Sequence, residues 1–90
     1  MAIESNRKKE LVAEFATEPG DTGSPEVQIA LLTEHVKNLT LHMQGHKKDY
    51  GSRRGLLAMV AKRTKLLKYL RRRRPDAYTA IVTRLNLRVR

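Results

Sequence analysis

The fold is decided by residues 24–43, which read SPEVQIALLTEHVKNLTLHM. Ser24 can accept a hydrogen bond from a free N–H at a helix start, Pro25 suits the first helical position, and Glu26 favours the positive end of the helix dipole. The apolar side chains that follow are separated by three or four residues: Ile29, Leu32, Val36, Leu39 and Met43. This spacing predicts a helix with one apolar seam, which Gly45 weakens or ends.

The residues before this stretch predict a shorter helix and a loop. Residues 3–15 place Leu11, Val12 and Phe15 at helical spacing. Because this helix is short, we expect its stability to depend on packing or on a partner. Residues 18–23 contain one proline and two glycines among polar side chains, which is the composition of a loop.

A third helix is expected after the stretch. Residues 46–52 read as a short connection, and the helix then runs from about Ser52 to Arg74. Apolar residues line its inner face: Leu56, Val60, Leu67 and Leu70. Basic residues occupy much of the remaining surface, so this helix is expected to be apolar on one side and cationic on the others.

Pro75 ends the third helix and begins a fourth, because the residue before a proline resists the helical conformation while proline itself suits a helix start. Ala77, Ile81 and Leu85 share one face of this helix. Asn86 is expected to end it, and residues 87–90 to fray. No segment alternates with a period of two, so no strands are predicted. We therefore predict one all-α domain over residues 1–90, in which helices two to four form a small antiparallel bundle and the N-terminal helix is more loosely attached.

Charge is distributed unevenly along the chain. Residues 1–49 hold six basic and eight acidic side chains, whereas residues 50–90 hold thirteen basic side chains and one acidic. No carboxylate occurs between Tyr50 and Pro75. Such an excess of like charges destabilises a compact fold unless something neutralises it. The expected partner is a polyanion, nucleic acid first and an anionic membrane second.

Composition and motifs argue against an enzyme. The absence of cysteine excludes disulfides and thiolate metal sites and suits the cytosol, and an aromatic content of 4% argues against a pocket for a small-molecule substrate or cofactor. No apolar run approaches the length of a membrane span, and the N-terminus does not resemble a signal peptide. No phosphate-binding glycine loop or nucleophile elbow occurs. His42 and His46 form half a zinc site without further ligands, so no metal is expected.

Polar side chains gather around the predicted turn between helices two and three. They are His42, His46, Asp49 and Ser52, with Lys47, Lys48, Arg53 and Arg54 beside them. Basic side chains bind phosphates without reading sequence, whereas short polar groups can read base edges and ribose hydroxyls in the shallow minor groove of an RNA helix. The structural alternative, a helix cap at Asp49 or Ser52 beside a solvated histidine pair, fits the sequence equally well.

A second cluster is expected at the opposite end of helices two and three. Residues 21–23 expose backbone N–H groups beside a helix start, which is a natural phosphate site, and Gln28 lies in the first turns of that helix. Tyr69 and Arg72 share a face of helix three, whose end lies beside the start of helix two if the two are antiparallel. Tyr69 could stack on or hydrogen-bond to a base, and Arg72 could hold phosphates. Alternatively, Tyr69 is half-buried core.

Four segments closely resemble the bacterial small-subunit ribosomal protein S15 family: DTGSPEVQIALLT at 21–33, HKKD at 46–49, SRRGLL at 52–57 and LLKYL at 66–70. They occur in the family's order and span most of the chain. The resemblance implies a four-helix protein that binds small-subunit ribosomal RNA early in assembly and helps to organise the platform. It also implies contact with large-subunit RNA at an intersubunit bridge, with other small-subunit proteins reached only through RNA.

The resemblance further assigns residues to two RNA features. It implies contact with a three-way junction through Thr22, Gly23, Gln28, Tyr69 and Arg72, to which we add Lys65. It implies contact with a minor groove at a G·U/G·C pair through His42, His46, Asp49 and Ser52. We assign phosphate contacts to Lys47, Lys48, Arg53, Arg54, Arg63 and Lys68.

Departures from the family pattern are few. Tyr50-Gly51 stands where a histidine pair is common, Thr64 lies among arginine-rich positions, and Asn86 stands where glycine is common. These positions affect peripheral phosphate contacts and the last helix cap. Two rival functions follow from the same composition: a DNA-compacting protein, which competition between RNA and duplex DNA would reveal, and a membrane-surface protein, which vesicle flotation would reveal.

Overall fold

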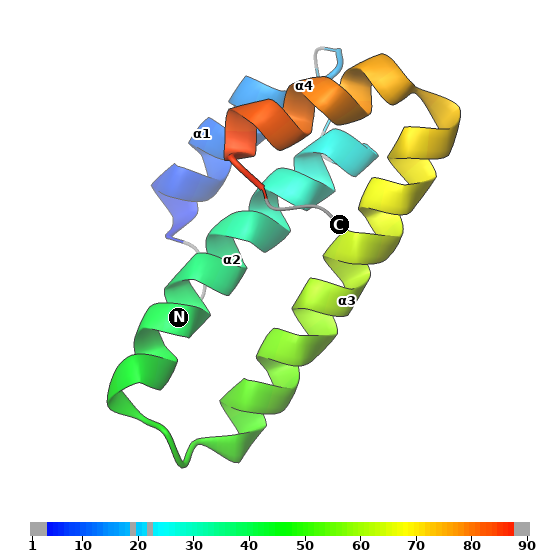
Figure 1. The fold of residues 1–90 in the computed structure, drawn as a ribbon. Helices are drawn as coiled ribbons and strands as arrows, with labels where there is room; N and C mark the ends of the chain where they lie inside the picture. The colour runs from blue at the N-terminus through cyan, green and yellow to red at the C-terminus, as the bar shows by residue number, and fades with distance from the viewer. Residues whose placement is uncertain (1–3, 19, 22, 88–90) are drawn as a thin grey trace.

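The computed structural model of the chain describes residues 4–18, 20–21 and 23–87. It contains four helices: α1 (Ser5–Phe15), α2 (Pro25–Gly45), α3 (Tyr50–Arg73) and α4 (Pro75–Leu85) (Figure 1). No strand occurs among the residues in these ranges, so the predicted all-α class is confirmed. The expected start of the first helix, Ile3, lies outside them.

Helices α2 and α3 run antiparallel, side by side, and are joined by residues 46–49 (Figure 1). From the end of α3, α4 turns back across the first half of α2. Within the described part of the chain, the backbone of α1 approaches only that of α2. This arrangement agrees with the predicted bundle of helices two to four, and the looser attachment expected for the N-terminal helix stays a prediction.

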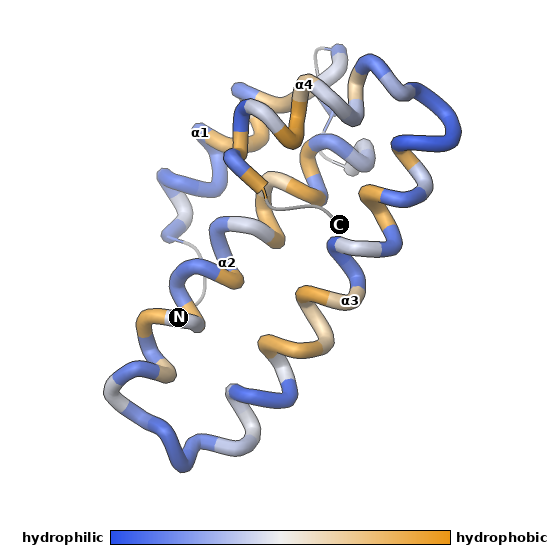
Figure 2. Tube along the Cα trace, viewed as in Figure 1, coloured by the Kyte–Doolittle hydropathy of each residue, from blue (hydrophilic) through white to orange (hydrophobic). Residues whose placement is uncertain are grey.

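The core lies at the end of the molecule where all four helices meet. Each helix contributes buried side chains: Leu11 and Phe15 from α1, Val27, Ile29 and Ala30 from α2, Leu67 and Leu70 from α3, and Ile81 from α4. Figure 2 shows apolar segments of α1, α2 and α4 gathered at this end. Removal of this apolar surface from water is the main term that favours the folded state.

Only some residues of the predicted apolar seams are buried. Ile29 and Leu39 of α2 are buried, as are Leu67 and Leu70 of α3. The other predicted seam residues are half-buried: Leu32, Val36, Met43, Leu56 and Val60. Met43 and Leu56 lie near the connection at residues 46–49, away from α1 and α4, so they have a single neighbouring helix.

Capping residues set the starts of α2 and α3. Ser24 Oγ accepts a hydrogen bond from the N–H of Val27 at 3.4 Å, and Pro25 is the first helical residue, as predicted. Helix α3 begins at Tyr50, two residues before the predicted start. The reason is that Asp49 accepts the N–H of Ser52 and so caps the helix from outside.

The end of α4 corrects one prediction. Asn86 adopts the left-handed conformation, with φ of 52°, that usually favours glycine at this position. The N–H of Leu87 donates to Val82 O at 3.0 Å and its side chain packs against the core, so Leu87 does not fray. This combination is a Schellman motif with its hydrophobic contact. The remaining predicted tail, residues 88–90, lies outside the described residues.

Candidate nucleic-acid interface

Helix α3 carries nine basic side chains, more than any other helix. The nine are Arg53, Arg54, Lys62, Arg63, Lys65, Lys68, Arg71, Arg72 and Arg73. Among the described residues, none of these nine forms an ion pair. The ion pairs that do form are Arg7 with Glu10 and Glu34, Arg84 with Glu14, and Arg74 with Glu26, while His42 and Asp49 form an ion pair only when the His42 ring is protonated. Within the part of the chain that the structure describes, no carboxylate therefore neutralises the charge of α3 through an ion pair.

The structure brings together the four polar residues predicted at the turn between α2 and α3, which we call the loop cluster: His42, His46, Asp49 and Ser52. Asp49 is its centre. Its carboxylate accepts hydrogen bonds from Ser52 Oγ at 2.7 Å, from the Ser52 N–H at 3.1 Å and from His42 Nε2 at 2.9 Å. Asp49 is therefore both the helix cap that we considered as an alternative and the anchor of the cluster.

The two histidine rings of the loop cluster are stacked. Their centroids lie 4.2 Å apart and their planes differ by 8°. His46 Nδ1 lies 3.0 Å from the backbone oxygen of His42, which fixes the second ring as well. His42 is half-buried whereas His46 is exposed, so the outer ring faces solvent at the tip of the molecule.

Hydrogen bonds from Ser52 and His42 lower the pKa of Asp49 from 3.8 to about 2. The unfolded chain therefore binds more protons than the folded chain between these two values, and stability is lost as the pH falls from about 4 to about 2. We expect the difference in thermal midpoint between the wild type and Asp49→Asn to shrink as the pH falls through this range, because the variant has no titrating group at this position. Circular dichroism melts at several pH values measure this difference, and a constant difference would contradict the assignment.

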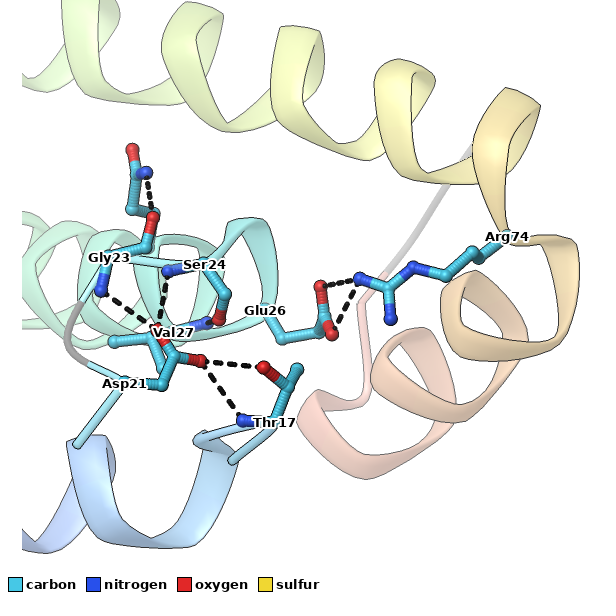
Figure 3. Close-up of polar contacts among 8 residues, drawn as sticks. Thr17, Asp21, Gly23, Ser24, Glu26, Val27 and Arg74 are labelled. Atoms are coloured by element: carbon cyan, nitrogen blue, oxygen red, sulfur yellow. Dashed lines mark hydrogen bonds and ion pairs between the residues drawn. The ribbon is translucent and has the colours of Figure 1, made fainter. Parts of the chain in front are cut away.

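At the opposite end of the α2–α3 pair, the predicted junction residues that the structure describes are Gly23, Gln28, Lys65, Tyr69 and Arg72, which we call the helix-end cluster. Thr22 lies outside the described residues. The buried carboxylate of Glu26 accepts two hydrogen bonds from Arg74 Nη2, at 2.7 and 2.9 Å (Figure 3). This contact ties the start of α2 to the residue that follows α3, so the two halves of the helix-end cluster lie at the same end of the molecule.

The loop before α2 is organised by Asp21 (Figure 3). Its carboxylate accepts hydrogen bonds from the N–H groups of Gly23 and Ser24, at 3.0 and 2.9 Å, and from the N–H and hydroxyl of Thr17, at 3.0 and 2.9 Å. Hydrogen bonds from Ser24 and Thr17 hold the pKa of Asp21 well below its usual range. The expectation that this loop exposes its N–H groups to phosphate is therefore wrong for Gly23, because an internal anion already occupies that donor.

Gln28 and Tyr69 are held in place by neighbours. Gln28 Nε2 donates to Gly23 O at 2.6 Å, which leaves the amide oxygen of Gln28 as an acceptor. Tyr69 is 41% exposed, so it is a surface residue rather than core. The guanidinium of Arg73 lies 5.5 Å from the centroid of its ring. An exposed tyrosine among cations can stack on a base or donate to it.

The predicted phosphate contacts differ in exposure. Lys47, Lys48, Arg53, Arg54 and Lys68 are exposed. Arg63 instead is half-buried and donates to Thr33 Oγ1 of α2 at 3.5 Å, and burial lowers its pKa. Arg71, which we did not assign, joins Lys65, Lys68 and Arg72 around a shallow depression on α3. The run of arginines at 71–74 in the sequence could have indicated that Arg71 belongs to this basic surface.

Neither a metal site nor a membrane span was found in the described part of the chain. No group of three potential metal-ligating side chains lies together in residues 4–18, 20–21 and 23–87. The described helices are also too short or too polar to cross a membrane.

Comparison with known proteins gives one consistent result. The family described as "Ribosomal protein S15" matches residues 8–88. The small ribosomal subunit protein uS15 of Bordetella parapertussis is 53% identical over 88 residues, which cover 98% of this chain and 99% of the relative. The protein of the same name from Campylobacter jejuni is 52% identical over 88 residues, covering 98% of each chain.

Proposed function

The chain belongs to the ribosomal protein S15 family, and from this premise we propose that it is a structural component of the small ribosomal subunit that binds ribosomal RNA directly. It holds RNA in a defined geometry and catalyses no reaction. The observation that carries the proposal is the set of nine cations on α3 that have no carboxylate partner among the described residues. Phosphates that neutralise them release condensed counterions, and this release supplies binding energy that does not depend on sequence.

Sequence and shape are read by the two clusters at the ends of the α2–α3 pair. The loop cluster presents short, fixed polar groups that suit the wide minor groove of an RNA helix, with Lys47, Lys48, Arg53 and Arg54 on the adjacent phosphates. The helix-end cluster combines an exposed tyrosine with Lys65, Arg72 and the Gln28 amide, which suits unpaired bases and crowded phosphates at a three-way junction. Thr22, next to Gly23 in the chain, belongs to this second site.

Two roles in the ribosome complete the proposal. By holding a junction and an adjacent duplex together, the protein helps to nucleate assembly of the platform, and it reaches other small-subunit proteins only through RNA. It also contacts large-subunit RNA at an intersubunit bridge. The support is family membership together with a flat shape, 39 × 31 × 18 Å, which leaves two broad faces for RNA.

The salt dependence of binding tests the electrostatic part. For a small-subunit ribosomal RNA fragment that carries the junction and its adjacent duplex, we expect log affinity to fall with log salt at a slope near −5, as for about six neutralised phosphates. Lys68→Gln on α3 should reduce the magnitude of this slope by about one. Lys9→Gln on α1 is the matched control and should leave it unchanged. A flat slope for the wild type would overturn the proposal.

Competition by duplex DNA separates the proposal from the DNA-compacting alternative. A protein that reads ribose hydroxyls and an RNA junction should bind duplex DNA of the same length about a hundredfold or more weakly. Filter binding with labelled RNA and unlabelled DNA measures this ratio. Equal competition would favour the alternative.

A further inference from the structure

The hydrogen-bond partners of the stacked histidines determine which nitrogen of each ring carries its proton. The Asp49 carboxylate has only lone pairs to offer, so His42 Nε2 must donate to it. A backbone oxygen likewise only accepts, so His46 Nδ1 must donate to His42 O. When both rings are neutral, the two remaining nitrogens, His42 Nδ1 and His46 Nε2, are acceptors.

The side-chain hydrogen-bonding atoms that the loop cluster leaves free are consequently acceptors. Ser52 uses its hydroxyl proton on Asp49, which leaves only lone pairs on its oxygen. His46 Nε2 belongs to an exposed residue. The minor groove of RNA offers two kinds of donor to such a surface, the guanine 2-amino group and the ribose 2′-hydroxyl.

When the histidine pair takes up protons, they bind at the two acceptor nitrogens, His42 Nδ1 and His46 Nε2. The first converts the His42–Asp49 contact into a full ion pair or turns His46 Nε2 into a donor. The second places two positive rings face to face at 4.2 Å, where they repel each other. Both steps replace an acceptor with a donor, and the second also opposes the stack itself.

Few other charged groups surround the pair. Asp49, at the start of α3, is the carboxylate bonded to His42, and Arg53 lies in the first turn of that helix. The connection contributes Lys47 and Lys48. On α2, no charged residue lies between Lys37 and His42. No neighbour except Asp49 therefore favours a second positive charge at this position.

We propose that the stacked His42–His46 pair makes recognition at the loop cluster proton-dependent, with the neutral pair as the form that binds. This inference rests on the minor-groove contact of the proposed function. Its sign is opposite to that of simple electrostatics, because added positive charge strengthens sequence-independent binding to phosphates while it removes the acceptors that discriminate. Histidine is the side chain whose ordinary charge change lies nearest to neutral pH, so the experiment varies pH on both sides of neutrality.

The experiment compares two RNAs with the full-length protein across pH. One is the small-subunit ribosomal RNA fragment described above, and the other carries inosine in place of guanine in the duplex next to the junction, which removes the 2-amino donors. We expect the ratio of the two affinities to fall by about tenfold from about pH 8 to about pH 5.5. His46→Gln, and the double variant His42→Gln/His46→Gln, should make the ratio nearly independent of pH.

His35→Gln is the matched control. This third histidine lies on α2 two turns before His42, and its removal should leave the wild-type pH profile intact. A ratio that favours guanine equally at every pH in the wild type would overturn the inference while the minor-groove contact stands. A ratio of one at every pH would instead overturn the minor-groove contact, and the inference with it. Thermal melts of each variant at both pH extremes confirm that folded proteins are being compared.

Discussion

Replacement of Leu70 with alanine is expected to lower the free energy of unfolding by about 3 kcal/mol. Leu70 has 0% of its surface exposed and lies in a core to which all four helices contribute. The substitution removes buried carbon atoms and leaves a cavity that the surrounding helices fill only in part. For a domain of this size the loss corresponds to a fall of roughly 12–20 °C in the thermal midpoint, which circular dichroism melting measures directly.

Leu57→Ala is the matched control for that experiment. It makes the same chemical change on the same helix at a side chain that is 63% exposed. We expect its effect to stay within about 0.5 kcal/mol. Equal losses for the two variants would contradict the description of one end of α3 as core and the other as surface.

Replacement of Asp49 with alanine is expected to weaken binding to the cognate ribosomal RNA fragment by about 10- to 100-fold while leaving the affinity for random RNA unchanged or slightly higher. Removal of a negative charge should by itself favour RNA. The expected loss arises because Asp49 holds the Ser52 hydroxyl and the His42 ring in place, so one substitution disturbs several of the proposed base-edge contacts. Titration of both RNAs under one salt condition measures the two affinities.

Asp76→Ala controls for charge. It removes the same charge from an exposed residue in the first turn of α4, far along the chain from the loop cluster. We expect it to leave the preference for cognate RNA intact. If Asp49→Ala instead weakened both RNAs equally, the loop cluster would have no role in discrimination.

The helices could be predicted closely because their signals are local. Ser24 and Pro25 mark the start of α2, and Pro75 separates α3 from α4, through interactions within a few residues. The start of α3 was predicted two residues late because Asp49 acts from outside the helix. Leu87 was expected to fray because its burial depends on how α4 folds back over the core, which no local pattern specifies.

The sequence predicted which residues form the candidate site but not which hydrogen bonds they make. The sequence placed the four residues of the loop cluster at one turn, and they do meet there. It did not indicate that Asp21 would capture the Gly23 N–H, because loop composition does not reveal which of several donors and acceptors pair. The contact between Glu26 and Arg74 joins residues 48 positions apart and exists only once α2 and α3 have packed.

Under the proposed function, the antiparallel packing of α2 and α3 has a thermodynamic consequence for the RNA. Ser52 and Tyr69 are separated by roughly 25 Å of uninterrupted helix, at about 1.5 Å per residue. A junction in free RNA samples many angles between its arms, and only a few of them present both recognition elements at that separation. The RNA then loses more conformational entropy on binding than the protein does. Binding shifts the population of its arm orientations toward the one that fits the rigid pair of helices.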